Sequence, residues 1–540
     1  MNRAPLCLAI ALASSALASP ALAQPPAASP PKLEVKYSQF TLPNGLNVIL
    51  HEDHRVPIVT VNTWYRVGSA RERPGRTGFA HLFEHLMFMG SGHVKPGEFD
   101  QWLEATGGDN NASTGSDRTN YWINVPSNAI DLALFLESDR LGYLLEAMTP
   151  KSVDAQRDVV KNERRQSIEN RPYGMADVVL GEMLFPEGHP YHWPVIGYMP
   201  DLTAASYQDV VDFFRKYYTP SNASLVVAGD IDPARTRAAV EKWFSDVKPA
   251  PSVWPMPIPA VQLDNVQKKT ITDRVELPRI YLAWITPRHF EPGDAALDVV
   301  AAVLTEGKNS RLYKRLVYDM QIAQEVTAFQ SSAELASNFQ IVAMPQPGHT
   351  IAEVQKVIDE ELQKLQKEEP TTREVERALN QIEASFYNRM ERVGGFGGVA
   401  DQMNSYFVDA GDPDWFNEDL SRYRALSPSD IRAALRHEER DLRDGHSVRL
   451  DDPHGQTVRE LTLLNRRQME GRWGPWLRRV TAIEGLLGRD DGGEEAERQE
   501  KSRDSGGHGR FSGSTVSSTR RSSGRNRAAA ARMSEGDSAR

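Results

Sequence analysis

The chain has 540 residues, of which 40% are hydrophobic and 25% are charged, and its formal net charge is −10. This length allows about two to four domains with full hydrophobic cores. The composition is ordinary for a soluble globular protein, and the negative charge does not favour general affinity for nucleic acid.

The N-terminus has the pattern of a secretory signal peptide, which we place at residues 1–23. Arg3 supplies the positive charge, Leu6 to Leu17 is a short apolar run, and Ala21-Leu22-Ala23 is an A-x-A cleavage site that leaves Gln24 as the first mature residue. The apolar run is too short for a convincing membrane span, and no later segment is long enough to be one. We therefore expect a periplasmic or secreted protein without a membrane span.

Cys7 is the only cysteine and lies inside the predicted signal peptide. The mature protein would then contain neither a disulfide nor a thiol nucleophile. Any zinc site in it would have to use histidine and carboxylate ligands.

A Pro- and Ala-rich lead-in at 24–33 precedes a first predicted domain at 34–248. Alternating apolar residues on both sides of Pro43-Asn44-Gly45 predict a β-hairpin. Apolar periodicity predicts the other elements of this domain, which are strands at 58–67, 119–125 and 224–228 and helices at 98–105, 129–148 and 153–170.

A Pro-rich linker at 249–264 leads to a second predicted domain at 265–437. A similar order of elements recurs there, with strands at 280–285 and 339–344 and helices at 295–304, 310–320, 351–367 and 373–392. The sequence thus predicts an α+β protein of two homologous α/β-sandwich domains, each of about 200 residues.

Residues 438–540 form a segment that we predict to be largely disordered. Its end is rich in Ser, Gly and Arg and has almost no large apolar side chains, so it cannot bury enough surface to fold. Three interpretations stay open: a disordered end without a role, an end altered by a frameshift, or a basic tail that contacts an acidic partner.

His81-Leu82-Phe83-Glu84-His85 is an H-x-x-E-H motif, the reverse of the H-E-x-x-H zinc-protease signature. On a helix, His81 and His85 lie on one face, one turn apart, and can bind one Zn²⁺. Glu84 projects beside the metal, which suits a general base acting on a zinc-bound water.

The motif lies between apolar residues on both sides, which predicts a buried helix. Two histidines and a glutamate on a buried helix need partners, and a metal ion would supply them. The alternative is a structural histidine pair. In the second domain the matching helix is the apolar run Leu297 to Leu304, so only the first domain can do this chemistry.

Catalytic zinc needs a third protein ligand, and Glu163 on the predicted helix at 153–170 is a candidate, although on its own it is one acidic residue among many. Here the chain resembles the insulinase/pitrilysin family of zinc peptidases, the inverzincins, over about 37–435. The resemblance depends on these segments: 78–88, 107–108, 111–114 with Thr119 and Tyr121, 159–166, 169–173, 189–191 with Gly197, and 218–222 with Gly229.

This resemblance implies that His81, His85 and Glu163 bind one zinc ion per chain and that Glu84 is the base. It implies that Asn111 and Ala112 lie on an edge strand that pairs with the backbone of a peptide substrate. It also implies two domains that form half of a clam-like chamber, and so a dimer, most simply with a non-catalytic relative.

Two positions depart from the family pattern. Gln156 stands where the family commonly has a second acidic residue, which usually supports the metal ligands from behind. An Arg/Tyr pair that grips substrate in relatives is not recognisable at 334–349, which suggests that the facing half is another polypeptide or is missing from this chain.

The sequence therefore predicts a zinc-dependent metalloendopeptidase that hydrolyses peptides or unfolded segments through a zinc-bound water activated by Glu84. Two alternatives stay open. One is a processing peptidase subunit that cuts at defined sites, and the other is a non-catalytic scaffold subunit of the same fold.

Overall fold

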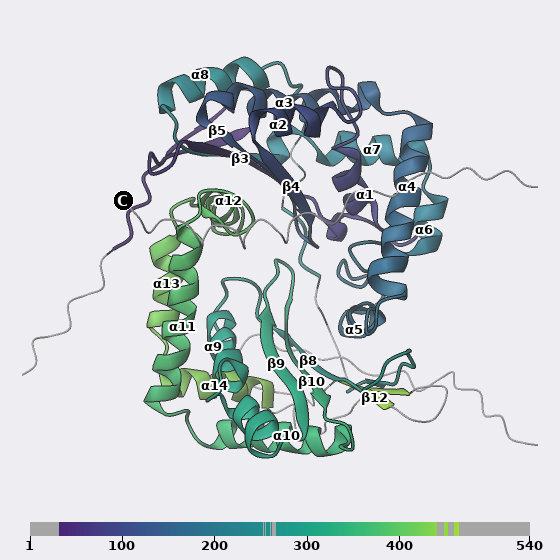
Figure 1. Cartoon of the computed structure of the whole chain (residues 1–540), viewed down its shortest axis with the longest axis vertical. Helices are drawn as coiled ribbons and strands as arrows, with labels where there is room; N and C mark the ends of the chain where they lie inside the picture. The colour runs from purple at the N-terminus through teal and green to yellow at the C-terminus, as the bar shows by residue number, and fades with distance from the viewer. Residues whose placement is uncertain are drawn as a thin grey trace, which may run out of the picture. The chain divides into compact units, whose positions relative to one another are not determined.

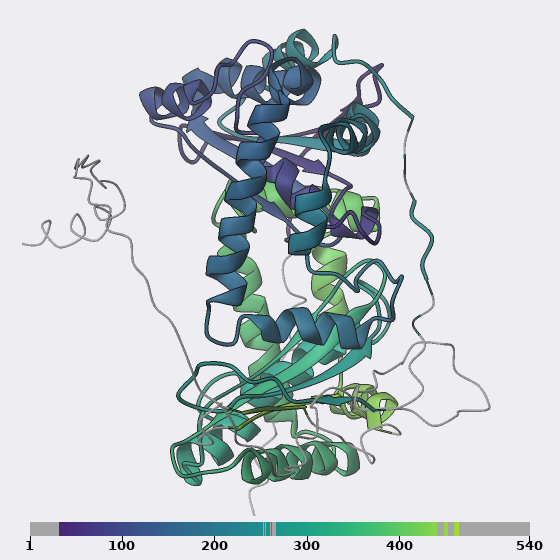
Figure 2. The same cartoon turned by 90° about the vertical axis from the view of Figure 1, so that its right-hand side faces the viewer.

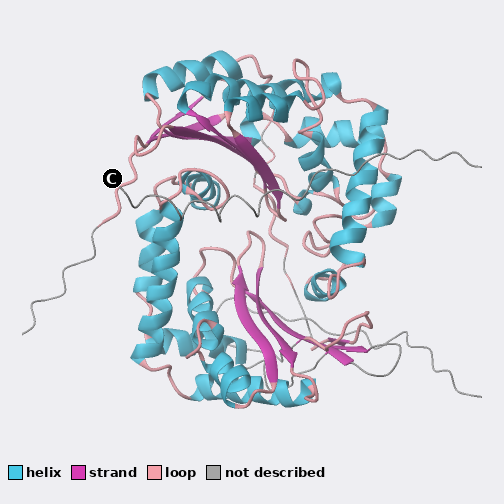
Figure 3. Cartoon of the chain, viewed as in Figure 1, coloured by secondary structure: helices cyan, strands magenta, loops and turns pink. Residues whose placement is uncertain are grey.

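The computed structural model describes residues 32–439, apart from 252, 254, 260 and 262–265, and the backbone of residues 448–451 and 458–463. These residues form two six-stranded sheets, each with helices packed against it (Figure 1, Figure 3). The predicted α+β class with two mixed domains is confirmed.

The first sheet has the strand order β1-β2-β6-β3-β5-β4, so that β4 is an edge strand. Its strands are β1 Ser38–Thr41, β2 Asn47–Glu52, β3 Ile58–Tyr65, β4 Asp109–Thr114, β5 Thr119–Pro126 and β6 Ala223–Gly229. The helices of this half are α1 Phe79–Leu86, α2 Glu98–Thr106, α3 Ile130–Ala147, α4 Pro150–Arg164, α5 Met175–Leu184, α6 Met199–Ala204, α7 Tyr207–Tyr217 and α8 Pro233–Phe244.

The second sheet has the order β11-β12-β8-β10-β9, with β7 paired to β12. Its strands are β7 Lys268–Lys269, β8 Ile280–Thr286, β9 Ala323–Ser331, β10 Ser337–Pro345, β11 Val448–Asp451 and β12 Val458–Leu463. The helices of this half are α9 Asp294–Thr305, α10 Ile351–Lys367, α11 Thr372–Met390, α12 Val399–Ala410, α13 Phe416–Arg424 and α14 Pro428–Glu439.

Both sheets are covered on two faces, which explains why β6 and β8 are buried at every position. In β6, Leu225 and Val227 face one core with α1, α3 and α8, whereas Val226 and Ala228 face another core with α12. In β8, alternate residues likewise divide between a core with α9 and α10 and a core with α5. The period of two along each strand thus distributes one apolar run between two layers.

The two halves exchange helices. Helix α12, from the second half, packs on the first sheet, and α5, from the first half, packs on the second sheet (Figure 1, Figure 2). Each sheet is therefore covered in part by a helix from the other side of the predicted linker at 249–264.

Most of the predicted elements are present, with ends shifted by a few residues. The predicted helix at 153–170 is α4 followed by a π-helical turn at Arg165–Glu169, and the one at 310–320 is mainly a π-helical turn at Tyr313–Asp319. Strand β9 was not predicted. Within the predicted tail, β12 pairs with β8 and β11, whereas most of the remaining tail, the signal peptide and parts of the linker lie outside the described residues.

Helix α9 matches α1 in its surroundings, since α9 packs against the edge strand β9 as α1 packs against the edge strand β4. Its residues Leu297, Val300 and Leu304 are buried in the second core. The helix thus has an apolar, packing role at the place where the first half presents histidines. No helix among the described residues combines the length and the apolar character needed to cross a membrane.

Candidate metal centre

Helix α1 presents the H-x-x-E-H motif. Its residues Phe79, Leu82, Phe83 and Leu86 are buried in the first core, so the opposite face, with both histidines and Glu84, is directed away from the core. The helix starts after Gly78, whose φ of 87° lies in the left-handed region and whose position leaves no room for a Cβ, which would meet the Ile196 carbonyl oxygen at 2.7 Å.

Glu72 supplies the helix cap that Gly78 cannot. The Glu72 carboxylate accepts the backbone N–H groups of Gly78 and Ala80, each at 2.8 Å, at the N-terminus of α1. Burial raises the pKa of Glu72 to about 8, against the opposing effect of these donors. The first turn of α1 is therefore held by a carboxyl group from the preceding loop.

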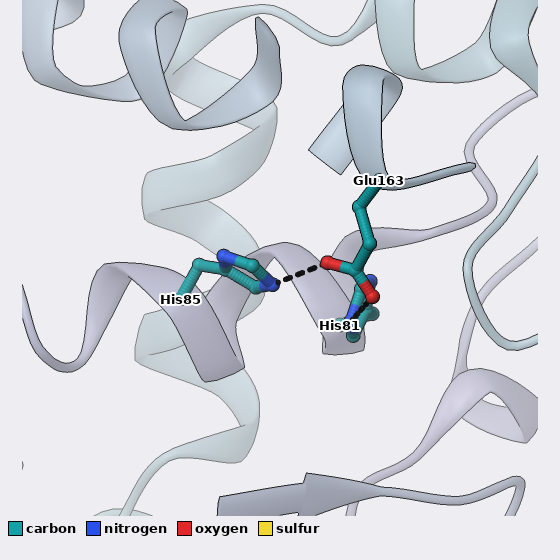
Figure 4. Close-up of side chains that lie close together, drawn as sticks. All are labelled: His81, His85 and Glu163. Carbon is teal, nitrogen blue, oxygen red and sulfur yellow. Dashed lines mark ion pairs between the residues drawn. The ribbon is translucent and has the colours of Figure 1, made fainter. Parts of the chain in front are cut away.

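His81, His85 and Glu163 meet at one point (Figure 4). His81 Nε2 is 3.5 Å from Glu163 Oε1, and His85 Nε2 is 3.1 Å from Glu163 Oε2. Each residue offers a ligand atom within 4.8 Å of the others, and no second cluster of this kind occurs in the described part of the chain. The glutamate comes from α4, which packs against α1.

The donor set fits zinc. A tetrahedral site with bonds of about 2.0–2.1 Å has edges of about 3.3 Å between its ligand atoms, which is close to both nitrogen–oxygen distances. Burial and the neighbouring His85 lower the pKa of His81 to about 4, so its imidazole is neutral and able to coordinate at neutral pH. The three side chains remain partly exposed, which leaves access to the site.

Glu84 is held by the neighbouring edge strand. The Thr114 hydroxyl, on β4, donates to Glu84 Oε2 at 2.5 Å. Burial raises the pKa of Glu84, while the Thr114 hydrogen bond, His85 and Arg118 oppose the rise and Glu163 adds to it. The arrangement gives a carboxyl group with fixed direction beside the three ligands, as a general base requires.

On the edge strand β4, the two predicted substrate-binding residues, Asn111 and Ala112, direct their backbone groups to opposite sides. Gly115 N–H donates to the Arg118 carbonyl, so these two residues form a hydrogen-bonded pair. From this pair, hydrogen-bonded and non-hydrogen-bonded pairs with β5 alternate along β4. It follows that Ala112 directs its N–H and C=O away from β5, whereas the backbone of Asn111 faces β5. The Ala112 N–H is meanwhile satisfied by Asn111 Oδ1 at 2.8 Å.

A cavity of about 790 Å³ lies in front of these residues. One wall contains His81, Glu84 and Glu163 with β4, and the other includes Arg279, just before β8, Tyr281 of β8 and Phe329 of β9. The second half of this chain thus lines part of the cavity. Arg279 and Tyr281 lie outside 334–349, and Arg279 pairs with Glu325 at 2.8 Å.

Gln156 and two further histidines have partners of their own. Gln156 is buried, and its amide Nε2 contacts the Met89 sulfur at 2.8 Å, so a role behind the metal ligands stays a prediction. His189 and His192 bond to Tyr191 N–H and the Phe185 carbonyl, respectively, and His189 stacks on the Phe185 ring. These contacts are structural.

Sequence reasoning did not single out Glu72, Thr114 or Arg118. Thr114 stood inside a segment used for the family resemblance, but nothing in the sequence indicates that its hydroxyl reaches Glu84. Glu72 had no local signal, because its partners are backbone N–H groups at the start of the next helix.

Comparisons with known proteins agree on one family. Residues 47–183 match the family model described as "Insulinase (Peptidase family M16)", and residues 204–382 match the one described as "Peptidase M16 inactive domain". The zinc protease PqqE of Helicobacter pylori is 30% identical over 361 residues, which are 66% of this chain and 80% of that protein.

More distant relatives extend the comparison. An uncharacterized zinc protease of Streptomyces coelicolor is 25% identical over 73% of this chain and 86% of its own length. A probable mitochondrial-processing peptidase β subunit of Arabidopsis thaliana is 24% identical over 65% of this chain and 67% of its own length. The crystal structure of a protease from Helicobacter pylori superposes with a TM-score of 0.70 at 27% identity, covering 79% of this chain and 99% of that one.

Proposed function

The chain belongs to the insulinase family (peptidase family M16), and we propose that it is an active zinc-dependent endopeptidase. The metal ligands would be His81, His85 and Glu163, with one zinc ion per chain, and Glu84 would be the catalytic base. The observation that carries this proposal is the convergence of these side chains, within 4.8 Å for the ligand atoms, at the wall of a large cavity.

The second half alone does not support catalysis. It matches the inactive-domain model, and its α9 has an apolar run where α1 has the motif. The first half, by contrast, has both histidines beside Glu163 and has Glu84 held by Thr114. These two facts support one active centre per chain.

The chemistry follows from the side chains. When bound, zinc would supply a Lewis acid that polarises a carbonyl and acidifies water. Glu84 would take a proton from the attacking water and deliver it to the leaving amine. The Thr114 hydroxyl would keep the Glu84 carboxylate directed into the cavity during both transfers.

Peptides and unfolded segments are the proposed substrates. The outward N–H and C=O of Ala112 can pair with an extended chain, which would displace Asn111 Oδ1 from the Ala112 N–H. An extended segment can enter the cavity between β4 and the second sheet, whereas a folded protein cannot offer such a strand. Asn111 would then contribute by its side chain and Ala112 by its backbone.

Export to the periplasm or secretion is proposed from the N-terminal pattern at 1–23. We also propose that the active protein is a dimer with a non-catalytic relative. Gln156 is proposed as a residue that supports the metal ligands. We keep the division at 34–248 and 265–437 as the proposed domain organisation.

A processing peptidase subunit is the second candidate function, and the similarity to the Arabidopsis thaliana protein favours it. The two functions differ in the number of cuts. A single cut in a precursor, with no cleavage of generic peptides, would support processing, whereas cleavage of many unrelated peptides would support the broader endopeptidase. Zinc binding without turnover, alone or with a partner subunit, would instead support a scaffold.

The test uses residues 24–540 loaded with zinc and a mixture of quenched fluorescent peptides. Glu84→Gln keeps the shape of the side chain but removes the base, and Glu104→Gln changes an exposed glutamate on α2 as a matched control. We expect cleavage by the unmodified protein and by the control, and none by Glu84→Gln or after chelation. One zinc per chain without any cleavage would contradict activity of this chain alone.

A further inference from the structure

Helix α12 brings a buried carboxylate to the face of the first sheet opposite α1. Asp401, near the start of this helix, is 8% exposed. Its Oδ1 accepts from Trp64 Nε1 on β3 and from Asn120 Nδ2 on β5, each at 2.8 Å, and its Oδ2 accepts from the Gly397 N–H at 2.8 Å. The second half thus binds two strands of the catalytic half through one side chain.

Asn120 continues the contact to the edge strand. Its Oδ1 accepts from the Ser113 hydroxyl at 2.6 Å and from Arg118 Nη1 at 3.0 Å. Arg118 Nη1 also donates to the Ser113 carbonyl at 3.0 Å, and its guanidinium lies 5.0 Å from the centre of the Trp64 ring. Ser113 on β4 is therefore connected to α12 by two consecutive hydrogen bonds.

The next residue of β4 faces the base. Because side chains alternate along a strand, Ser113 faces α12 and Thr114 faces α1. Thr114 donates to Glu84 at 2.5 Å, as described above. A displacement of this end of β4 would move the donor that directs Glu84, and also the Ala112 backbone groups that would bind substrate.

The stability of the fold does not by itself explain the hydrogen-bond network around Asp401. A carboxylate buried among neutral donors loses its hydration, and an apolar replacement is often as stable. Buried polar groups can instead select one arrangement among several, since each donor must find its acceptor. Asp401 meets donors from β3, β5 and the turn before its own helix at once, which is a geometry that only one placement of α12 on the sheet provides.

We propose that Asp401 is a positioning residue that, through Asn120 and Ser113, holds the end of β4 and with it Thr114 and Glu84 in the arrangement for cleavage. The catalytically silent half would thereby set the geometry of the active half. This inference rests on the proposed peptidase function for its kinetic consequence, but not for its structural one.

The test compares Asp401→Ala with Asp419→Ala in the full mature chain. Asp419 is buried to the same extent, at 9% exposure, but its donors are Tyr406 and Arg422, both in the second half. Alanine at 401 removes both acceptor oxygens, so the donors from Trp64, Asn120 and Gly397 lose their shared acceptor. Ser113→Ala removes the other end of the network and serves as a second variant.

The first readout is hydrogen–deuterium exchange of residues 109–118, measured without metal or substrate. We expect faster exchange there in Asp401→Ala and Ser113→Ala, but not in Asp419→Ala. The second readout is cleavage, for which we expect kcat/KM to fall by about threefold to thirtyfold in the two network variants, with zinc content unchanged. A loss of fold alone would accelerate exchange over the whole first half and would affect both aspartate variants.

The proposal is overturned if residues 109–118 exchange in Asp401→Ala as they do in Asp419→Ala, or if the two variants have the same kcat/KM. If the unmodified protein cleaves nothing, the peptidase proposal fails separately, and the exchange result still decides whether Asp401 holds β4.

Discussion

Replacement of Thr114 by valine tests the role of the edge strand in catalysis. Valine has nearly the shape of threonine, so the packing of β4 against α1 is retained while the hydroxyl that donates to Glu84 Oε2 at 2.5 Å is lost. The carboxylate would still be present beside the ligands, but it would have no donor to fix its direction. We expect a lower rate of proton transfer with unchanged metal binding.

The size of the effect follows from the hydrogen bond. A hydrogen bond to a charged group contributes about 1.5–3 kcal/mol, and about 1.4 kcal/mol corresponds to a factor of ten in rate. Glu84 is only partly shielded from solvent, so water can replace part of the lost donor. We therefore expect kcat to fall by about tenfold, near the lower end of the range of roughly ten- to 150-fold.

The assay is cleavage of a quenched fluorescent peptide over a range of substrate concentrations, so that kcat and KM are separated. Zinc content is measured on the same samples by mass spectrometry. Thr114→Ser retains a hydroxyl and is the matched control, for which we expect most of the activity to return. Equal kcat for Thr114→Val and the unmodified protein, at equal zinc content, would refute the assigned role of the hydroxyl.

Three further outcomes are expected. Burial raises the pKa of Asp298 to about 7, so the folded state binds more protons than the unfolded state between about pH 4 and 7. The folded state therefore loses stability as the pH rises through this window. In calorimetry, Asp298→Asn should unfold about 2–4 °C higher than the unmodified protein at pH 8 but not at pH 4. A fragment of residues 32–248 lacks α12 and would expose Ile49 and Val226, so we expect a low soluble yield and binding of a dye that recognises apolar surface. Co-expression of residues 266–439 should reduce this dye binding. A soluble fragment that does not bind the dye would contradict the expectation. Added zinc should raise the unfolding temperature of the mature protein but not that of His85→Ala, because only the folded chain brings the ligands together. An equal rise in both proteins would mean that zinc binds at another place.

Local patterns predicted much of the fold. The hairpin around Pro43-Asn44-Gly45 and the helices α3, α10 and α11 follow from alternation or helical periodicity over a few residues. Strand β9 was missed because its outward residues are polar and mix with apolar ones without clear alternation. Helix α5 was missed because its apolar face packs on the other half, so its partners are far away in the sequence.

The active-site residues likewise divide into those that local sequence patterns predicted and those that depend on distant contacts. His81, Glu84 and His85 fall within five positions, so the helix alone places them together. Glu163 needed the family resemblance, because its place beside the histidines depends on how α4 packs against α1. Thr114 and Asp401 could not be assigned, since the former acts across a strand–helix contact and the latter across 281 positions of sequence to Asn120.

The sequence by itself determined the export pattern, the motif-bearing helix, the order of most elements and the family resemblance, since each depends on residues close together in the chain or on matched segments. The tertiary structure decided which helix covers which sheet, the direction of the Ala112 backbone groups and the hydrogen bonds that connect α12 to the base. These features depend on contacts between segments that are distant in sequence, and the burial of polar groups permits only those arrangements in which each donor finds an acceptor.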